Sequence, residues 1–199
     1  NCLSAVRALQ EGMFQDFSAS ADPSQGVERV ARLRSRMRAL GVDAVVVPRS
    51  DEHMGEYVPP SAERLKWLTG FTGSAGVAII GSTAAALFVD GRYTLQAGTQ
   101  VDQGTFEVLQ IPENEPANWL GSKVKKGGTV GFDPWLHTSA WVTRTKELLG
   151  KHGVRLKPLG RNPVDAVWGR QQPAPPLGPV AIHALKFAGK PAEEKIASL

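Results

Sequence analysis

The chain has 199 residues, of which 42% are hydrophobic and 21% charged, a balance typical of a globular domain with an additional segment. No apolar run approaches the roughly 18 residues of a membrane span, and the start of the chain lacks the pattern of a signal peptide. The single cysteine, Cys2, excludes a disulfide within the chain and fits the reducing cytoplasm. The net charge of +4 permits an acidic partner without requiring one.

The first predicted element is an arginine-rich helix that begins near residues 23–25 and ends at Gly41. Its apolar residues fall within a sector of roughly 80° on a helical wheel: Val30, Leu33, Met37 and Leu40. The five arginines spread around the rest of the wheel and have no aromatic neighbours for stacking. We therefore expect a solvated helix with an apolar seam, and no nucleic-acid partner.

Strand and helix patterns then alternate along the chain. Strands are expected at 42–47, 76–81, 84–90, 105–111, 127–133 and 154–159, with 76–81 and 84–90 forming a hairpin. Helices are expected at 62–70, 90–100, 112–124 and 139–153. This alternation predicts an α/β fold in which helices cover both faces of a mixed β-sheet.

Particular residues are assigned roles within these helices. Ser61 is expected to cap the helix at 62–70, which ends at Gly70. Trp119 and Leu120 are expected to be the buried residues of 112–124. In the helix at 139–153, Trp141, Thr145 and Leu148 are expected to lie on one side.

The composition changes after residue 160. Five prolines between Pro163 and Pro179 predict a semi-rigid connector at 161–179. Beyond it, 180–189 has a strand pattern and 190–199 starts a helix. Because one strand and one short helix cannot bury a core, we expect 180–199 to begin a second domain of a longer chain.

The glycine-rich stretch TGFTGSAG at 69–76 raises the question of a phosphate-binding loop. Such a loop needs a lysine beside serine or threonine and a following helix, whereas this stretch has no lysine and runs into an apolar, β-branched segment. A dinucleotide fingerprint and a nucleophile elbow also require a following helix. A nucleotide site and a nucleophilic serine are therefore both disfavoured.

Other polar clusters are incomplete as catalytic sets. The four histidines are far apart, and the dense cluster of Asp51, Glu52, His53 and Glu56 is interpreted as a solvated loop and not as a metal site. Asp90-Gly91-Arg92-Tyr93 places a carboxylate, a guanidinium and a phenol at a strand end. Two interpretations of this turn stay open: a set of binding groups, or an internal Asp90–Arg92 pair with Tyr93 packed beneath it.

Several segments, in order, resemble landmarks of the three-domain Xaa-Pro aminopeptidases (aminopeptidase P) of the creatinase/prolidase superfamily. They are PRSDEHMGEYVPPSAERLKWLTGFTGSAGVAII, LFVDGRYTLQA followed by QVD, VGFDPWLHT, NPVDAVW and KFAGKPAEEKI. The ERLKWLTGFTGSAG and DGRYTLQA blocks are the most specific, and the resemblance runs from about Met13 to Leu199.

The resemblance implies a domain organisation for the whole protein. Residues 1–12 would be an N-terminal extension, 13–160 a creatinase-type N-terminal domain, 161–179 the proline-rich linker, and 180–199 the start of a truncated second domain. A third, catalytic domain would carry a dinuclear metal site, usually manganese, and would remove the N-terminal residue from peptides with proline second. None of its ligands lies in this chain, so the chain alone is expected to be inactive and to need no cofactor.

The resemblance also implies partners and a site. The partners would be the protein's own catalytic domain, proline-containing peptides and a second copy in a homodimer, in the cytoplasm and with no membrane. Residues expected to face the substrate entrance are Phe71, Thr72, Gly73, Ser74, Arg92, Tyr93 and His53. The alternative is a non-enzymatic interaction module of the same fold.

Overall fold

The computed structural model describes residues 22–199. Cys2, Met13 and the extension expected at 1–12 lie outside the described residues. The strands are β1 (Ala44–Pro48), β2 (Gly76–Gly81), β3 (Ala85–Asp90), β4 (Glu107–Ile111), β5 (Thr129–Phe132) and β6 (Arg155–Pro158). The α-helices are α2 (Ser24–Leu40), α3 (Arg64–Thr69), α4 (Thr94–Gln100), α5 (Pro116–Lys123), α6 (Ser139–Lys151), α7 (Pro163–Trp168), α8 (Leu185–Ala188) and α9 (Ala192–Ala197). Short 3-10 turns are η1 (Pro60–Ala62), η2 (Gly91–Tyr93), η3 (Pro134–Leu136) and η4 (Gly169–Gln171).

The six strands form one mixed sheet in the order β4-β3-β2-β1-β5-β6. β2 is antiparallel to both of its neighbours, β1 and β3, and the pairs β3–β4, β1–β5 and β5–β6 are parallel. Every strand except β2 therefore runs in one direction. The expected hairpin is confirmed, with Ile79 opposite Ala86.

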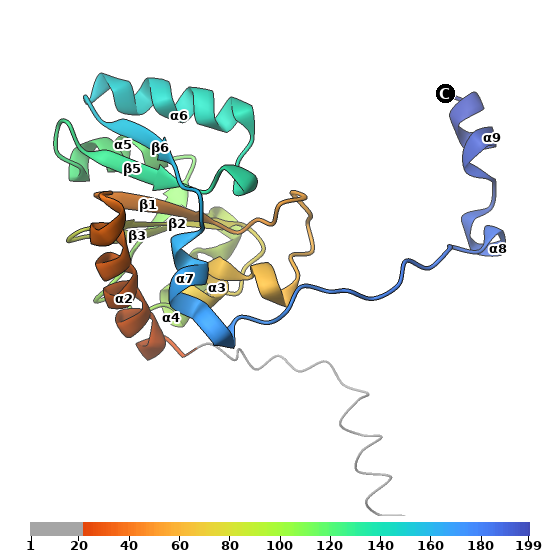
Figure 1. Ribbon diagram of the computed structural model, residues 1–199, viewed down its shortest axis with the longest axis horizontal. Coiled ribbons are helices and arrows are strands. Elements are labelled where there is room, and N and C mark those ends of the chain that lie inside the picture. Colours follow the sequence, from red (N-terminus) through yellow and green to blue (C-terminus); the bar gives the residue numbers. More distant parts are fainter. Residues whose placement is uncertain (1–21) are drawn as a thin grey trace, which may run out of the picture.

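Helices cover both faces of this sheet, as the sequence predicted (Figure 1). Because successive side chains of a strand point to opposite faces, Val45 and Val47 of β1 face one cluster and Ala44 and Val46 face the other. The first face packs against α2, α3, α4 and α7, and the second against α5 and α6. The central strands are thus buried on both sides.

Helix α2 ends at Gly41, whose left-handed backbone (φ 64°) terminates it as expected. Three of its arginines donate hydrogen bonds to backbone carbonyl groups in other elements: Arg29 to Trp67 of α3, Arg32 to Val167 of α7 (2.6 Å), and Arg34 to Gly81 of β2 (3.0 Å). The spread of arginines around this helix is explained by the several elements that surround it.

Helix α7 is part of the first domain's core, in contrast to the connector expected from residue 161. Val164 is fully buried, and Trp168 stacks on Trp67 with ring centroids 5.2 Å apart. Asn162 caps the helix by accepting a hydrogen bond from the Val164 N–H at 2.9 Å. Residues 173–184, in contrast, are exposed and form no helix or strand.

Three smaller expectations are corrected. The strand expected at 180–189 does not form: nearly all of its residues are exposed, no strand within residues 22–199 lies beside it, and residues 185–188 are helical instead. Ser61 lies in a 3-10 turn and does not cap α3. The inward face of α6 is set by Thr145 and Leu149, not Leu148, since residues four apart lie on one helix face.

In helix α5, Leu120 is buried as expected, while Trp119 is partly exposed and its indole N–H donates to Glu107 at 3.0 Å. No helix within residues 22–199 is long and apolar enough to cross a membrane.

Candidate functional site

The carboxyl ends of the five parallel strands meet at one edge of the sheet, which we call the carboxyl edge. Neighbouring strands β1 and β5 leave this edge toward opposite faces, β1 to α3 and β5 to α6. Adjacent parallel strands that diverge in this way leave a crevice between their loops, where ligands of open α/β sheets bind. β3 and β4 diverge in the same way, to α4 and α5.

The glycine-rich stretch 69–76 forms the loop between α3 and β2 at this edge. Gly70 ends α3 with a left-handed backbone (φ 85°) that favours glycine. Phe71, one of the residues expected at the substrate entrance, is 1% exposed, and its ring is a core side chain. Gly73 crosses directly over that ring, since a Cβ at position 73 would lie 2.2 Å from Phe71 Cζ.

Thr72 is held by a side-chain amide network below the loop. Its backbone N–H donates to Gln100 Oε1 at 2.9 Å, and its hydroxyl accepts from Gln96 and Gln100 at 2.9 and 2.8 Å. Gln100 is buried. Because buried amides need partners, this network fixes the loop against α4. Thr72 is thus mainly a structural residue.

The Asp90–Tyr93 turn lies beside this loop. Asp90 accepts hydrogen bonds from the Arg92 backbone (2.9 Å) and from its guanidinium (2.6 Å), and these bonds lower the pKa of the Asp90 carboxyl. The internal ion pair, one of the two interpretations of this turn, is therefore present. Tyr93 packs edge-on against Phe71, with ring centroids 5.8 Å apart.

Three side chains of the two segments lie together in a group that we call the rim cluster: Ser74 and Arg92, which are exposed, and Tyr93, which is half-buried. The hydroxyls of Ser74 and Tyr93 lie 2.6 Å apart, and this hydrogen bond lowers the pKa of the Tyr93 phenol. The Arg92 guanidinium carbon lies 5.2 Å from the centre of the Tyr93 ring. The arrangement presents the Arg92 guanidinium, paired with Asp90, and hydroxyl groups to solvent.

His53 is separate from this group. It lies in the loop after β1, where the buried Asp51 carboxylate accepts hydrogen bonds from the backbone N–H groups of His53 (3.0 Å) and Gly55 (2.9 Å). Its side chain is 81% exposed. Among residues 22–199, no hydrogen bond or ion pair joins His53 to the rim cluster, and no group of three or more His, Cys, Asp or Glu side chains is placed to hold a metal ion.

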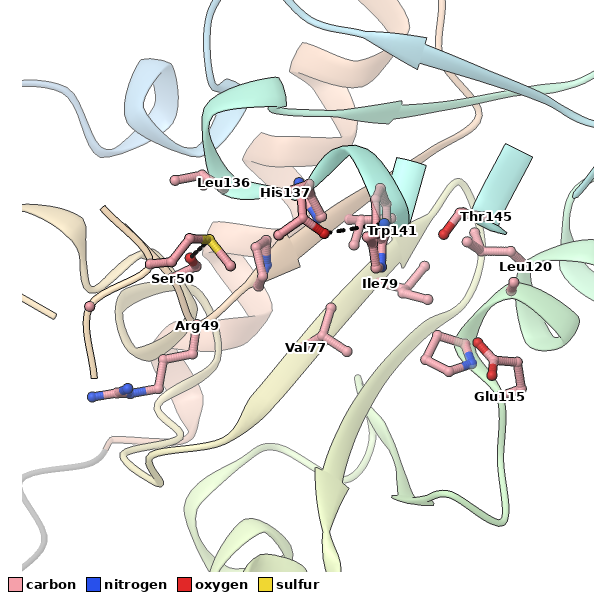
Figure 2. Close-up of a pocket in the computed structure, with 17 residues that line it drawn as sticks. Arg49, Ser50, Val77, Ile79, Glu115, Leu120, Leu136, His137, Trp141 and Thr145 are labelled. Atoms are coloured by element: carbon pink, nitrogen blue, oxygen red, sulfur yellow. Dashed lines mark hydrogen bonds between the residues drawn. The ribbon is translucent and has the colours of Figure 1, made fainter. Parts of the chain in front are cut away.

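A pocket of about 330 Å³ opens where β1 and β5 diverge; we call it the switch pocket (Figure 2). Its volume is at the lower end of the range for small-ligand sites, about 300–1,000 Å³. Val77 and Ile79 of β2 form its floor, and α5 and α6 flank it. The remaining lining residues are Val46, Pro48, Arg49, Ser50, Met54, Gly55, Glu115, Pro116, Ala117, Leu120, Leu136, His137, Thr138, Trp141 and Thr145.

His137 lies in an aromatic wall of this pocket, with its ring 3.9 Å from that of Trp141 and 5.6 Å from that of Phe132. Its Nδ1 is 2.9 Å from the Asp133 carbonyl oxygen and therefore donates the proton. Burial lowers the pKa of this imidazole below its ordinary value of 6.5. Burial thus favours the neutral form of His137.

The model of the Creatinase/Prolidase N-terminal domain matches residues 29–165 of this chain. The chain belongs to this family. The matched region contains the whole six-stranded sheet, the rim cluster and the switch pocket. All the geometry described above is therefore within the creatinase/prolidase N-terminal domain.

Individual relatives agree with this assignment. A probable Xaa-Pro aminopeptidase P from Neosartorya fischeri is 40% identical over 185 residues, which cover 92% of this chain and 28% of that protein. The X-prolyl aminopeptidase of Caenorhabditis elegans, a cytosolic enzyme with a di-nuclear active site, has a similar structure, with a TM-score of 0.78 and 29% sequence identity. The superposed region covers 87% of this chain and 30% of that enzyme. The N-terminal domain of the peptidase PepQ from Mycobacterium tuberculosis shares the fold (TM-score 0.53, 24% identity; 70% of this chain, 98% of that one). The chain spans less than a third of the length of the curated relatives it matches.

The sequence patterns did not indicate the switch pocket. Its residues come from segments that are far apart, and the aromatic wall is contributed by the short stretch from His137 to Trp141. The one local signal is the pair of polar residues between two aromatic rings at the start of α6. That pattern is equally typical of an ordinary helix N-terminus. Thr138 does cap α6, since its hydroxyl accepts a hydrogen bond from the Trp141 backbone N–H (3.2 Å).

We expect His137 to make the stability of this domain depend on pH. Since its pKa is lowered in the folded state, the unfolded chain binds the proton first as pH falls. The stabilisation is fully present above the ordinary value of 6.5, and is lost as pH falls from there toward the folded-state pKa. Urea unfolding at a series of pH values would show a shallower dependence for His137→Phe than for the wild type. Identical slopes for the two proteins would contradict this expectation.

Proposed function

We propose that this chain is the N-terminal, non-catalytic domain of a metal-dependent Xaa-Pro aminopeptidase, which removes the N-terminal residue from peptides with proline second. The observation that carries the proposal is the 40% identity to a probable Xaa-Pro aminopeptidase P across 92% of the chain. The chain covers 28% of that relative, so the catalytic residues belong to other parts of the protein. The chain alone is then inactive.

The proposed enzyme requires a metal centre, which we place outside this domain. Within residues 22–199 there is no suitable group of three His, Cys, Asp or Glu side chains. A dinuclear centre, for which we propose manganese, would be held by the catalytic domain. The cytosolic description of the C. elegans relative supports a cytoplasmic location, and a homodimer is part of the same proposal.

We propose that the carboxyl edge borders the substrate entrance. Besides the rim cluster, this edge carries exposed apolar side chains on the segments that follow β1, β3 and β5: Met54 (56% exposed), Tyr57 (91%), Leu95 at the start of α4 (87%) and Trp135 in η3 (74%). Exposed apolar groups gathered on one side of a domain are typical of an interaction surface. Such a surface beside a cation and hydroxyl groups suits both the catalytic domain and an extended peptide. Thr72 and Gly73 shape the loop, and His53 lies on the same edge.

The packing of α7 supports a proposal for the domain boundaries. Gln172 donates to the Ser61 carbonyl (2.8 Å) and to Asp165 (2.9 Å), which ties the end of α7 to the loop after β1. We propose that the first domain extends from about residue 13 to residue 172. The proline-rich linker then comprises 173–179, and a second domain begins at residue 180.

The test is kinetic and uses the full-length protein. The wild type should release the first residue from Xaa-Pro peptides and lose this activity with a chelator. Arg92→Ala should lower kcat/KM by about tenfold for longer peptides, the effect of losing one charge-assisted hydrogen bond, with a smaller loss for dipeptides. Arg36→Ala, an exposed arginine on α2, is the matched control and should leave both rates unchanged.

Two results would contradict the proposal. Unchanged kinetics of Arg92→Ala on peptides of every length would exclude the rim cluster from the entrance. A full-length protein that folds but has no metal-dependent peptidase activity would favour the second candidate, a non-enzymatic interaction module. The exposed apolar side chains at the carboxyl edge also support that candidate.

A further inference from the structure

The switch pocket contains polar groups that the proposed function does not use. Thr145 is 6% exposed and lies in the pocket wall beside Leu120 (Figure 2). Its hydroxyl makes no hydrogen bond within the part of the chain that the structure describes, although a threonine within a helix can bond to the carbonyl four residues earlier. Among the described residues, this hydroxyl is not one of the fully enclosed polar atoms that lack a partner, so it can be reached from the pocket and can bond to a ligand there.

A second unused donor lies on the same helix. The Trp141 side chain extends from α6 toward Val77 and Ile79 on the pocket floor (Figure 2). Its backbone N–H bonds to Thr138, but its indole N–H has no partner among residues 22–199. Thr145 follows Trp141 by four residues, so the two donors lie on the same face of the helix. Both donors are thus available on the face of α6 that lines the pocket.

The charged groups at the margin of the pocket are already engaged. Glu115 pairs with Arg144 at 3.0 Å. The Arg49 guanidinium donates to the carbonyls of Glu56 (3.1 Å) and Ser74 (3.2 Å) and points away from the pocket floor in Figure 2. An ionised ligand would therefore enter an apolar space without a free counter-charge, which is costly.

We propose that the switch pocket binds an uncharged, mainly apolar ligand bearing a carbonyl group that accepts hydrogen bonds from Thr145 and Trp141. The floor of Val77 and Ile79 and the aromatic wall bind the apolar part. A free small amide and the apolar part of a peptide both have this chemistry. The site lies on the α5/α6 face and does not depend on the activity of the full-length protein.

The proposal is tested by heteronuclear NMR on this chain, following the indole N–H signals of its five tryptophans. Trp141→Phe identifies the signal of Trp141. Two neutral probes distinguish the two possible sources of the ligand: N,N-dimethylbenzamide represents a free amide, and acetyl-prolyl-proline methylamide represents a peptide. Saturable displacement of the Trp141 signal at millimolar concentration by either probe is the expected result, and the better ligand identifies the source.

Matched variants decide whether the site is the one described. Thr145→Val keeps the shape but removes the hydroxyl, and should weaken binding about 2- to 10-fold, the net effect of one hydrogen bond. Thr145→Ser should bind like the wild type, as should Thr143→Val, which alters an exposed threonine of the same helix. The proposal is overturned if neither probe moves the Trp141 signal, if Thr145→Val binds equally well, or if the free acid of the prolyl probe binds as tightly as its amide.

Discussion

Replacing Gly73 by alanine is expected to destabilise the domain by about 3 kcal/mol, at the upper end of the range for overpacked cores. The new Cβ would lie 2.2 Å from Phe71 Cζ and less than 3 Å from two further ring atoms. Phe71 is 1% exposed and packs against the core, so its ring has no free space into which to move. The backbone of the loop would have to shift, and with it the rim cluster. Chemical denaturation of wild type and variant measures the difference.

A matched control uses the same substitution elsewhere. Gly98 lies within α4 and its nearest neighbouring atom, on Gln103, would be 3.8 Å from an added Cβ. Gly98→Ala should therefore stabilise by up to about 1 kcal/mol, because alanine is the better helix former. If the ring of Phe71 causes the clash, Gly73→Ala should cost far less in a Phe71→Ala background. Equal costs in the two backgrounds would refute the steric explanation.

Trp168→Ala is expected to cost about 3–5 kcal/mol, the range for removing a large buried aromatic side chain. Trp168 is 8% exposed and stacks on Trp67 across the contact between α7 and α3. The same contact includes the Arg64–Asp165 ion pair, with two hydrogen bonds of 2.7 and 3.0 Å. Loss of the stacked ring would weaken the attachment of the whole helix. The weaker attachment of α7 would be measured as a lower free energy of unfolding and as faster protease cleavage near residue 160.

Trp135→Ala serves as the control for this prediction. Trp135 is 74% exposed, and its truncation should change stability by no more than about 0.5 kcal/mol. A small effect at Trp168, similar to that at Trp135, would mean that α7 is a dispensable part of the connector. The comparison therefore tests the domain boundary at residue 172 directly.

The behaviour of α7 shows where reading the sequence failed. The local signals of a helix were present: Asn162 as a cap, Pro163 at the first position, and an apolar pair, Val164 and Val167. The prolines between residues 173 and 179 nevertheless favoured the prediction of a connector over that of a helix. Burial of α7 depends on surfaces supplied by α2 and α3, which are distant in sequence and invisible to a local pattern.

The strand pattern at 180–189 failed for a related reason. Alternating apolar residues favour an extended chain, but a strand needs a neighbour to bond with. Within the described residues, this segment is exposed and has no such neighbour. Arg92, Tyr93 and Ser74 do lie together, whereas Phe71 is buried because the glycine at position 73 lets the loop close over its ring.

Local sequence was sufficient for the α/β class, for helix α2 and its end at Gly41, and for the β2–β3 hairpin. Those features depend on side-chain periodicity and turn residues within a few positions. The switch pocket and the buried place of Phe71 required the folded chain. Their cause is the parallel pairing of β1 with β5, in which Ala44 meets Val130, and the closure of one loop over one ring. Contacts between such distant segments are set by the packing of the whole domain.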